Sequence, residues 1–217
     1  RAYILIDGGI EQADQALKAL SASLNISPKR AAGHHLNGYI LAQINRHEEA
    51  LKSYIRASEL EPKNQRYQEA EAIARVHVGE GHKVIKALQL MLRRSPKNED
   101  LRRALAHVHM GKKQWGKAER ILKEAPKNSA EIRRDLAVVS LSSGRTKRAV
   151  SMLKSLRAEQ PKNRAIAYNL ALALRHSGAM REAYLQAKQA RQMTGSAEDE
   201  LLLETRLLLE LGRAQEA

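Results

Sequence analysis

Histidine is the residue of this 217-residue chain with the most varied chemistry, because its imidazole can bind a metal or transfer a proton. The chain has eight histidines and no cysteine. Helical zinc sites place two histidines three or four residues apart beside a carboxylate. Here His34 and His35 are adjacent, while His107 and His109 are two residues apart, so each pair diverges on a helix. The spacing predicts no metal site and implies no cofactor.

Residues that could carry out nucleophilic catalysis are also not arranged for it. Ser142, Ser143 and His176 show neither the strained nucleophile turn nor the base-and-orienter pattern of a hydrolase. Residues 79–81, Gly-Glu-Gly, do not form a phosphate loop, because no strand precedes them and the other glycines of that motif are missing. We therefore predict that the chain is not an enzyme.

The elements that position these side chains are best defined in residues 31–64. Two amphipathic helices with a tight turn between them are predicted, and the small Gly38 allows another helix to approach closely. Asn45 tolerates the left-handed backbone that ends a helix, and Pro62 stops the second one. A hairpin this small cannot bury its own apolar face, so it requires neighbours.

Those neighbours follow from a repetition of the same pattern. The five prolines lie 34, 34, 30 and 35 residues apart, and four of them open the tripeptide Pro-Lys-Asn: Pro28, Pro62, Pro96, Pro126 and Pro161. A helix–turn–helix unit that recurs at about 34 residues is typical of tetratricopeptide repeats. The chain resembles that family across essentially its whole length.

The resemblance implies an all-α fold, namely a right-handed superhelical solenoid of antiparallel helix pairs. We expect one array over residues 1–217 with a partial repeat at each end, and therefore a segment of a longer chain. The expected repeats are 1–30 (partial), 31–64, 65–98, 99–129, 130–163, 164–197 and 198–217 (partial).

Two details of the array are also predicted. The fourth repeat is four residues short, which removes about one turn from its second helix and should distort the superhelix locally. Trp115, the only tryptophan, is expected in the turn of this repeat, where it packs across the repeat. In the first repeat, apolar spacing predicts one shared helix face for Ala16, Leu17, Leu20, Leu24 and Ile26.

In tetratricopeptide proteins the inner helices line a concave groove that binds extended peptides or partner helices, and the resemblance implies such a groove here. Its lining is obtained by carrying the groove positions over residue by residue. The predicted groove residues are His35, Tyr39, Arg66, His77, Arg103, His107, Arg134, Tyr168, Arg175 and His176, with Gln43, Glu69, Met110 and Glu131 beside them.

This lining favours an acidic or extended peptide partner. Arginine binds a carboxylate through two parallel hydrogen bonds, and tyrosine offers an apolar face with a polar tip. The alternative is that the arginines are solvated or paired with acids on adjacent helices, where exposed pairs contribute little. The hypothesis assigns the capture of carboxylates to Arg66, Arg103, Arg134 and Arg175.

One specialisation of the family is disfavoured. Members that bind chaperone tails clamp a terminal carboxylate with lysine and asparagine at set groove positions. In successive repeats of this chain the asparagine position holds Tyr39, Ile73, His107, Val138 and Leu172. A heat-shock chaperone tail is therefore not the expected ligand.

The charge of the chain favours acidic partners in general. The formal net charge is +14 and the pI is about 10.1, which suits an acidic protein, a nucleic acid or an anionic membrane surface, unless the cations only solvate outer helix faces. Nucleic acid is disfavoured but not excluded, because aromatic residues make up only 3% of the chain and no nucleic-acid-binding motif occurs. No apolar run approaches the ~20 residues that span a bilayer.

The sequence therefore predicts a non-catalytic scaffold or adaptor that holds a protein or peptide partner and has no small-molecule substrate. One alternative is a recruiting or assembly segment of a larger enzyme or of a bacterial envelope export machine, for polysaccharide secretion or pilus assembly. Another is a nucleic-acid-associated adaptor. The compartment stays open, because a chain without cysteine suits cytoplasm and periplasm alike.

Overall fold

The computed structural model describes residues 10–126, 129–193 and 198–212, and every regular element in these ranges is a helix. This confirms the predicted all-α repeat solenoid. The helices are α1 (Ile10–Ile26), α2 (Ala31–Gln43), α3 (His47–Leu60), α4 (Gln65–His77), α5 (Gly81–Arg94), α6 (Glu99–Gly111), α7 (Trp115–Lys123), α8 (Ala130–Ser142), α9 (Thr146–Glu159), α10 (Arg164–His176), α11 (Met180–Gln192) and α12 (Glu198–Glu210).

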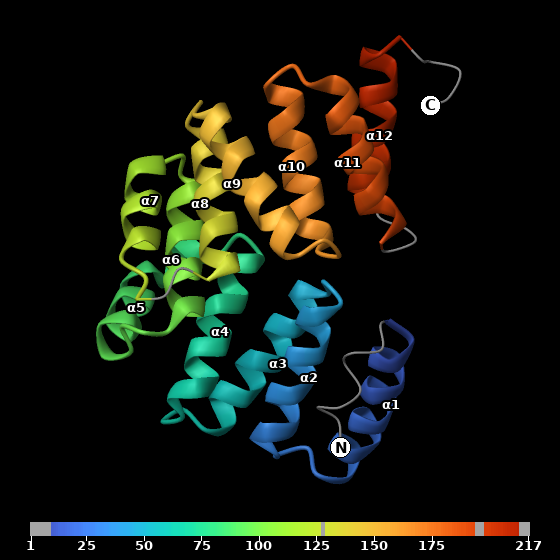
Figure 1. Ribbon diagram of the computed structural model, residues 1–217. Coiled ribbons are helices and arrows are strands. Elements are labelled where there is room, and N and C mark those ends of the chain that lie inside the picture. Colours follow the sequence, from blue (N-terminus) through green and yellow to red (C-terminus); the bar gives the residue numbers. More distant parts are fainter. Residues whose placement is uncertain (1–9, 127–128, 194–197, 213–217) are drawn as a thin grey trace. The chain divides into compact units, whose positions relative to one another are not determined.

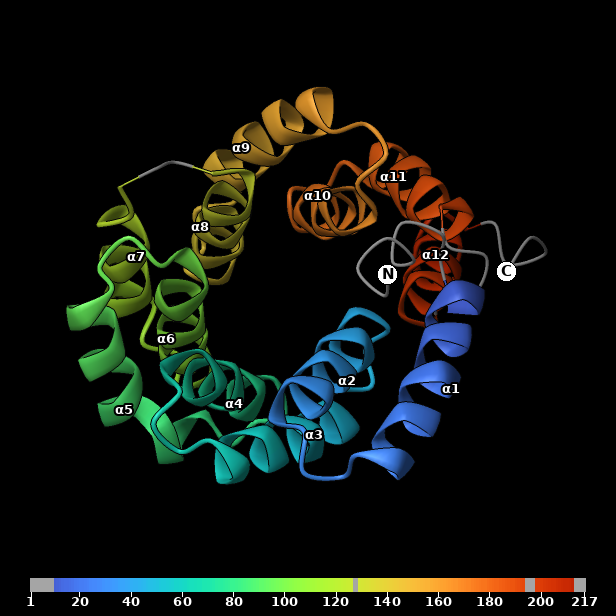
Figure 2. The same cartoon turned by 90° about the horizontal axis from the view of Figure 1, so that it is seen from below.

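The chain divides into two compact units, residues 1–112 and 113–217. In the first unit α2, α4 and α6 lie in one layer, with α2 against α4 and α4 against α6, and α1, α3 and α5 form the other layer (Figure 1). In the second unit α8 and α10 are in contact, and α7, α9 and α11 lie on their other side (Figure 2). Alternate helices of each unit therefore share a layer.

The tripeptide Pro-Lys-Asn separates one helix from the next: the proline follows the end of one helix, and the asparagine caps the N-terminus of the following helix. The side chain of Asn64 accepts a hydrogen bond from the backbone N–H of Arg66 at the start of α4. Asn98 and Asn163 cap α6 and α10 in the same way. Such a cap satisfies a backbone donor that has no partner inside the helix.

The turns inside the repeats depend on left-handed backbone. Asn45 has φ 61° between α2 and α3, as the sequence predicts, and Lys113 has φ 55° between α6 and α7. Glycine takes this conformation at the other described turns, with φ from 73° to 83°, at Gly79, Gly144, Gly178 and Gly212. Glycine has no Cβ and adopts positive φ without strain.

Gly38 permits the close approach that the sequence predicts. A Cβ built on this residue of α2 would lie 2.8 Å from Cδ1 of Tyr54, which is on α3. The ring of Tyr54 therefore occupies the space that an alanine methyl group would take. Glycine at this position is a packing requirement, even though it weakens a helix interior.

The cores of the two units differ in composition. In the second unit one cluster of buried leucine, isoleucine and alanine side chains includes Leu153 on α9, Leu170 on α10 and Leu207 on α12. Around α1 to α4 of the first unit the clusters are smaller, and two of them contain a tyrosine, Tyr54 or Tyr67. Aromatic rings thus take the place of aliphatic side chains in this part of the first unit.

Three details of the sequence prediction can be compared with the structure. The second helix of the fourth repeat, α7, has 9 residues against 14 in α9, as the deletion requires. Trp115 was predicted in the turn, which is wrong: it is the first residue of α7, because the left-handed Lys113 already completes the turn. Residues 1–9, which belong to the partial repeat predicted for residues 1–30, lie outside the described residues.

The shared apolar face predicted for α1 is correct only in part. Ala16 is buried, and Leu17 and Leu20 are partly buried, but Ile26 in the last turn is 85% exposed. Helical spacing fixes the side of the helix on which a residue lies. It does not fix how far along the helix a neighbour covers that side.

Candidate functional site

A cavity of about 360 Å³ opens in the first unit between α2, α3, α4 and α6. Its volume is within the range of about 300–1,000 Å³ that ligand sites occupy. The structure brings together here all the predicted groove residues of the first unit except Met110. They are His35, Tyr39, Gln43, Arg66, Glu69, His77, Arg103 and His107.

His35 lies at the tyrosine-rich end of this cavity. Its ring centroid is 5.5 Å from that of Tyr54, edge to face, and 5.0 Å from that of Tyr67. Burial lowers the pKa of His35, and the nearby charge of Arg66 lowers it further. At neutral pH the imidazole of His35 is therefore uncharged, and it lines the cavity with a ring whose nitrogen atoms are polar.

Two histidines stack at the other side of the cavity. The rings of His47 on α3 and His77 on α4 lie 5.1 Å apart with an angle of 12° between their planes. The side chain of His77 is partly exposed to solvent. Desolvation of its ring by the surrounding protein atoms is nevertheless the largest of the causes that lower its pKa. Positive charge on the nearby His47, His107 and Arg103 lowers the pKa of His77 further.

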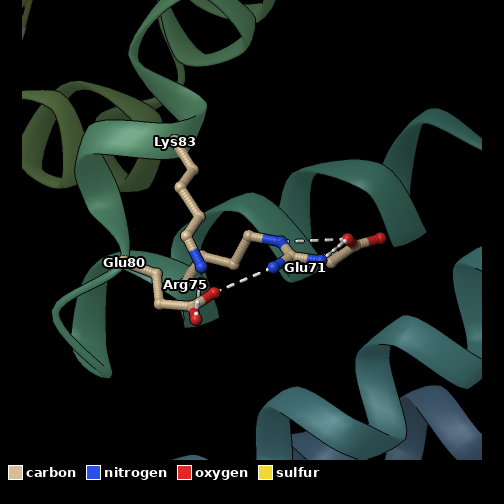
Figure 3. A network of polar contacts seen from close by, with 4 residues as sticks. All are labelled: Glu71, Arg75, Glu80 and Lys83. Carbon is tan, nitrogen blue, oxygen red and sulfur yellow. Dashed lines mark hydrogen bonds and ion pairs between the residues drawn. The ribbon is translucent and has the colours of Figure 1, made fainter.

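An ion-pair network fixes the end of α4, where His77 lies (Figure 3). Arg75 donates hydrogen bonds to Glu71 on the preceding turn, at 2.8 and 3.1 Å, and to Glu80 in the turn, at 2.9 Å. Lys83 on α5 donates to the other oxygen of Glu80, at 2.8 Å. The network joins α4, the turn and α5, and it restricts the position of the His77 backbone.

The charges in the cavity are balanced. The arginines Arg66 and Arg103 face the same space as the carboxylates Glu69 and Asp100. Glu69 accepts hydrogen bonds from the side-chain amides of Gln65, at 2.7 Å, and of Asn98, at 3.0 Å. His35 and His77, whose pKa is lowered, add positive charge to this space only as the pH falls.

The other predicted groove residues lie in the second unit, on α8 and α10. Arg134 is 3.6 Å from the carboxylate of Asp135, and Tyr168 packs against the apolar core. The Nε–H of Arg175 donates to both carboxylate oxygens of Glu210 on α12, each at 3.1 Å. His176 is exposed at the end of α10. Arg175 is therefore paired with an acidic residue of a neighbouring helix. This pairing is the alternative to ligand capture that the sequence left open.

Sequence reasoning missed several residues that line the cavity: His47, Tyr54, Asn98 and Asp100. His47 and Tyr54 belong to α3, the second helix of its repeat, whereas the prediction considered only first helices. A usable signal was present. His47 is a ring-bearing side chain at the first position of α3, and Trp115 holds the first position of α7.

Among the described residues, no group of three or more histidine, aspartate or glutamate side chains is placed to hold a metal ion. Among the helices described here, none has both the length and the apolar character that crossing a bilayer requires.

Comparison with known proteins agrees with this geometry. Residues 79–138 match the family model of the tetratricopeptide repeat. No curated protein sequence matches the chain. A crystal structure of a tetratricopeptide repeat protein from Parabacteroides merdae is similar, with a TM-score of 0.68 and 18% identity over 98% of this chain and 84% of that one.

Two other solved structures extend the comparison. TTC0263, a tetratricopeptide protein from Thermus thermophilus, has a TM-score of 0.73 and 19% identity over 82% of this chain and 99% of its own. The human IFIT1 dimer with PPP-AAAA has a TM-score of 0.76 and 17% identity, and this chain spans 57% of its length. The fold is therefore that of a helical-repeat protein of a kind typically used as an interaction scaffold. The described helices therefore have the fold of tetratricopeptide repeat proteins, and residues 79–138 match the model of that family.

Proposed function

We propose that the first unit is a peptide-binding scaffold whose cavity holds an extended, acidic segment of a protein partner. The observation that carries this proposal is the convergence of groove residues from α2, α4 and α6 on one open cavity. These positions come from three successive repeats and face one space, which an extended segment could occupy.

The lining suits a peptide with alternating acidic and apolar side chains. Arg66 and Arg103 belong to neighbouring helices of one layer and can each bind a carboxylate with two hydrogen bonds. The same cavity is lined by apolar groups, among them Ile73 and Ala74, which can cover an aliphatic or aromatic side chain. An extended backbone places alternate side chains on opposite faces, so a segment lying across the layer would present both kinds.

The role that we propose is binding. The polar groups that line the cavity include amides, carboxylates, guanidinium groups and imidazoles, all of which can form hydrogen bonds with a bound peptide. We therefore assign the polar groups of the cavity to recognition and orientation of the partner.

The test is a binding measurement with the full chain. Fluorescein-labelled peptides of about twelve residues, in which Glu or Asp alternates with Leu or Tyr, are titrated by fluorescence anisotropy at low salt. In the double variant R66Q/R103Q the affinity should fall about tenfold or more, because two charge-assisted contacts are lost.

The matched control is R134Q/R175Q, which removes the same charge from the second unit. Its affinity should stay within about twofold of the unchanged chain, because Arg175 is already bound to Glu210. Equal losses in the two double variants would contradict the assignment to the first unit. Failure of the unchanged chain to bind any of the acidic peptides better than lysine-containing counterparts would overturn the proposal.

A further inference from the structure

The large positive charge of the chain does not lie in the helices that supply most of the groove lining. Helix α2 has no Lys, Arg, Asp or Glu, while α4, α6 and α8 each have two basic and two acidic residues. In contrast, α5 has four basic residues and no acidic residue, α9 has four and one, and α7 and α11 each have three and one. The net charge of +14 therefore needs a different explanation from peptide capture.

In the second unit, the outer helices α7 and α9 are joined by a cluster of basic side chains around one carboxylate. Glu119 on α7 binds Arg145, the residue before α9, at 2.7 Å, and lies 3.6 Å from Arg148 on α9. It also binds Lys123 on its own helix, at 2.9 Å. A single carboxylate thus connects the two helices and lies beside exposed cations of both.

The acidic residues of this surface are already occupied. Glu119 has three basic neighbours, and the hydrogen bonds from Arg145 and Lys123 lower its pKa to about 2. Glu159, the acidic residue of α9, accepts a hydrogen bond from Arg133 of α8, at 2.7 Å. Lys117, Arg120 and Lys147 are exposed and form no ion pair with any residue that the structure describes. An excess of positive charge therefore remains for a partner.

The chemistry of the surface identifies the kind of partner. None of the large apolar side chains that are exposed in the described ranges belongs to α7 or α9. A membrane surface requires an apolar face to insert, and a protein interface requires apolar or aromatic anchors at its centre. A phosphodiester backbone requires only exposed lysine and arginine. Trp115 is the one aromatic residue of α7 and α9, and it is half-buried. Stacking on bases would therefore contribute little to the affinity for a nucleic acid.

We propose that the α7–α9 surface, defined by Lys117, Arg120, Lys123, Arg145, Lys147 and Arg148, binds nucleic acid through the phosphates of its backbone. Binding of this kind has little sequence preference and depends strongly on salt, because each neutralised phosphate releases counterions. The second unit then has an interaction surface that is separate from the groove of the first unit.

The experiment uses the full chain and a fluorescein-labelled duplex DNA of about 20 base pairs, titrated by anisotropy at several salt concentrations from about 50 to 200 mM. The triple variant K117Q/R120Q/K147Q removes three exposed charges without breaking an ion pair in the described structure. Its affinity should fall about tenfold or more at the lowest salt concentration. The slope of log affinity against log salt should become shallower by about 2 to 3, since each phosphate contact contributes roughly 0.9.

The control variant is K18Q/K29Q/K63Q, which removes the same charge from exposed positions of the first unit. It should change affinity less than about threefold and leave the slope within about 1 of its original value. Circular dichroism of both variants checks that the helices are retained. Binding of the acidic peptides should be unchanged in K117Q/R120Q/K147Q, which separates this surface from the groove.

Three results would overturn the proposal. The first is equal loss of DNA affinity in both triple variants, which would mean diffuse attraction by net charge. The second is no binding of duplex DNA, or of a matching single-stranded RNA, by the unchanged chain at about 50 mM salt. The third is tighter binding to vesicles of anionic phospholipid than to duplex DNA, lost in the α7–α9 variant, which would identify a membrane as the partner.

Discussion

Tyr54 in the first unit and Leu153 in the second occupy the eighth position of their helices, α3 and α9, and they show how the two units differ. The residues at the matching eighth position of the first helices are Gly38 and Ala137. In the first unit a tyrosine ring packs on a glycine and its polar edge reaches the cavity. In the second unit leucine and alanine belong to one closed apolar core. One repeat pattern thus produces either an open cavity or a closed core.

The groove side of the helices shows the same contrast. The ninth position of the first helices holds Tyr39, Ile73 and His107 in the first unit, and Val138 and Leu172 in the second. Polar and aromatic groups at this position can contact a ligand, whereas valine and leucine mainly pack. We infer that recognition by the second unit depends on the outer surface of its helices, while recognition by the first depends on its groove.

The largest expected effect is the removal of a leucine from the closed core. Leu153→Ala should lower the free energy of unfolding of the second unit by about 3 kcal/mol, because a fully buried leucine leaves a cavity. Trp115 fluorescence reports on the second unit, while circular dichroism reports on both units. In guanidinium unfolding, the transition seen by Trp115 fluorescence should move to a lower denaturant concentration. The part of the circular dichroism transition that comes from the first unit should not move. The exposed Ser151→Ala is the control on the same helix.

If the two signals shift together in Leu153→Ala, the units unfold as one. The comparison between an independent open unit and an independent closed unit would then be wrong.

A smaller effect is expected from exchanging the packing pair of the first unit for that of the second. Gly38→Ala should destabilise the first unit by about 1–2 kcal/mol, because the new methyl group lies within 3 Å of the Tyr54 ring. The double variant Gly38→Ala/Tyr54→Leu should recover part of that loss, since it recreates the pair that Ala137 and Leu153 form by position. Circular dichroism measures both changes. A double variant that is less stable than either single variant would contradict this account of the cavity.

How much of this could be predicted from the sequence depends on the range of the interactions. Pro-Lys-Asn, the left-handed Asn45 and the short α7 follow from neighbouring residues, so they were predictable. The stacking of His47 on His77 depends on how one hairpin rests on the next, which residue spacing does not specify. The bond from Arg175 to Glu210 depends on the same hairpin contact. The first-unit positions predicted to line a groove border the cavity because they lie on successive first helices that form one layer.

Next in size is the carboxylate that connects α7 and α9. Glu119→Gln should destabilise the second unit by about 1 kcal/mol at neutral pH, a modest value because solvent screens its exposed partners. The folded-state pKa of Glu119 is lowered from 4.5 to about 2, so its contribution is present above pH 4.5 and is lost as the pH falls towards 2. Trp115 fluorescence should therefore show a difference between the variant and the unchanged chain at pH 7 that disappears near pH 2. A difference that persists there would show that Glu119 acts through packing and not through its charge.

The smallest expected effect is a pH dependence that separates the two units near neutrality. In the folded first unit the pKa of His35 and of His77 is below the ordinary value, chiefly because of burial. The unfolded chain then binds more protons than the folded chain as the pH falls through about 6.5, so the stability of the first unit should decrease between pH 7.5 and 5.5. Glu119 contributes no change to the second unit in this range, because its carboxylate is ionised throughout.

Circular dichroism should therefore detect a loss of stability at pH 5.5 that Trp115 fluorescence does not follow. His77→Gln should reduce the loss, because the substituted side chain does not titrate, whereas the exposed His82→Gln on α5 should not change it. Equal losses in the two units, or a loss unaffected by His77→Gln, would remove the histidine cavity as the cause. An acidic peptide in the cavity should oppose the loss, because a carboxylate beside His77 favours its protonated form.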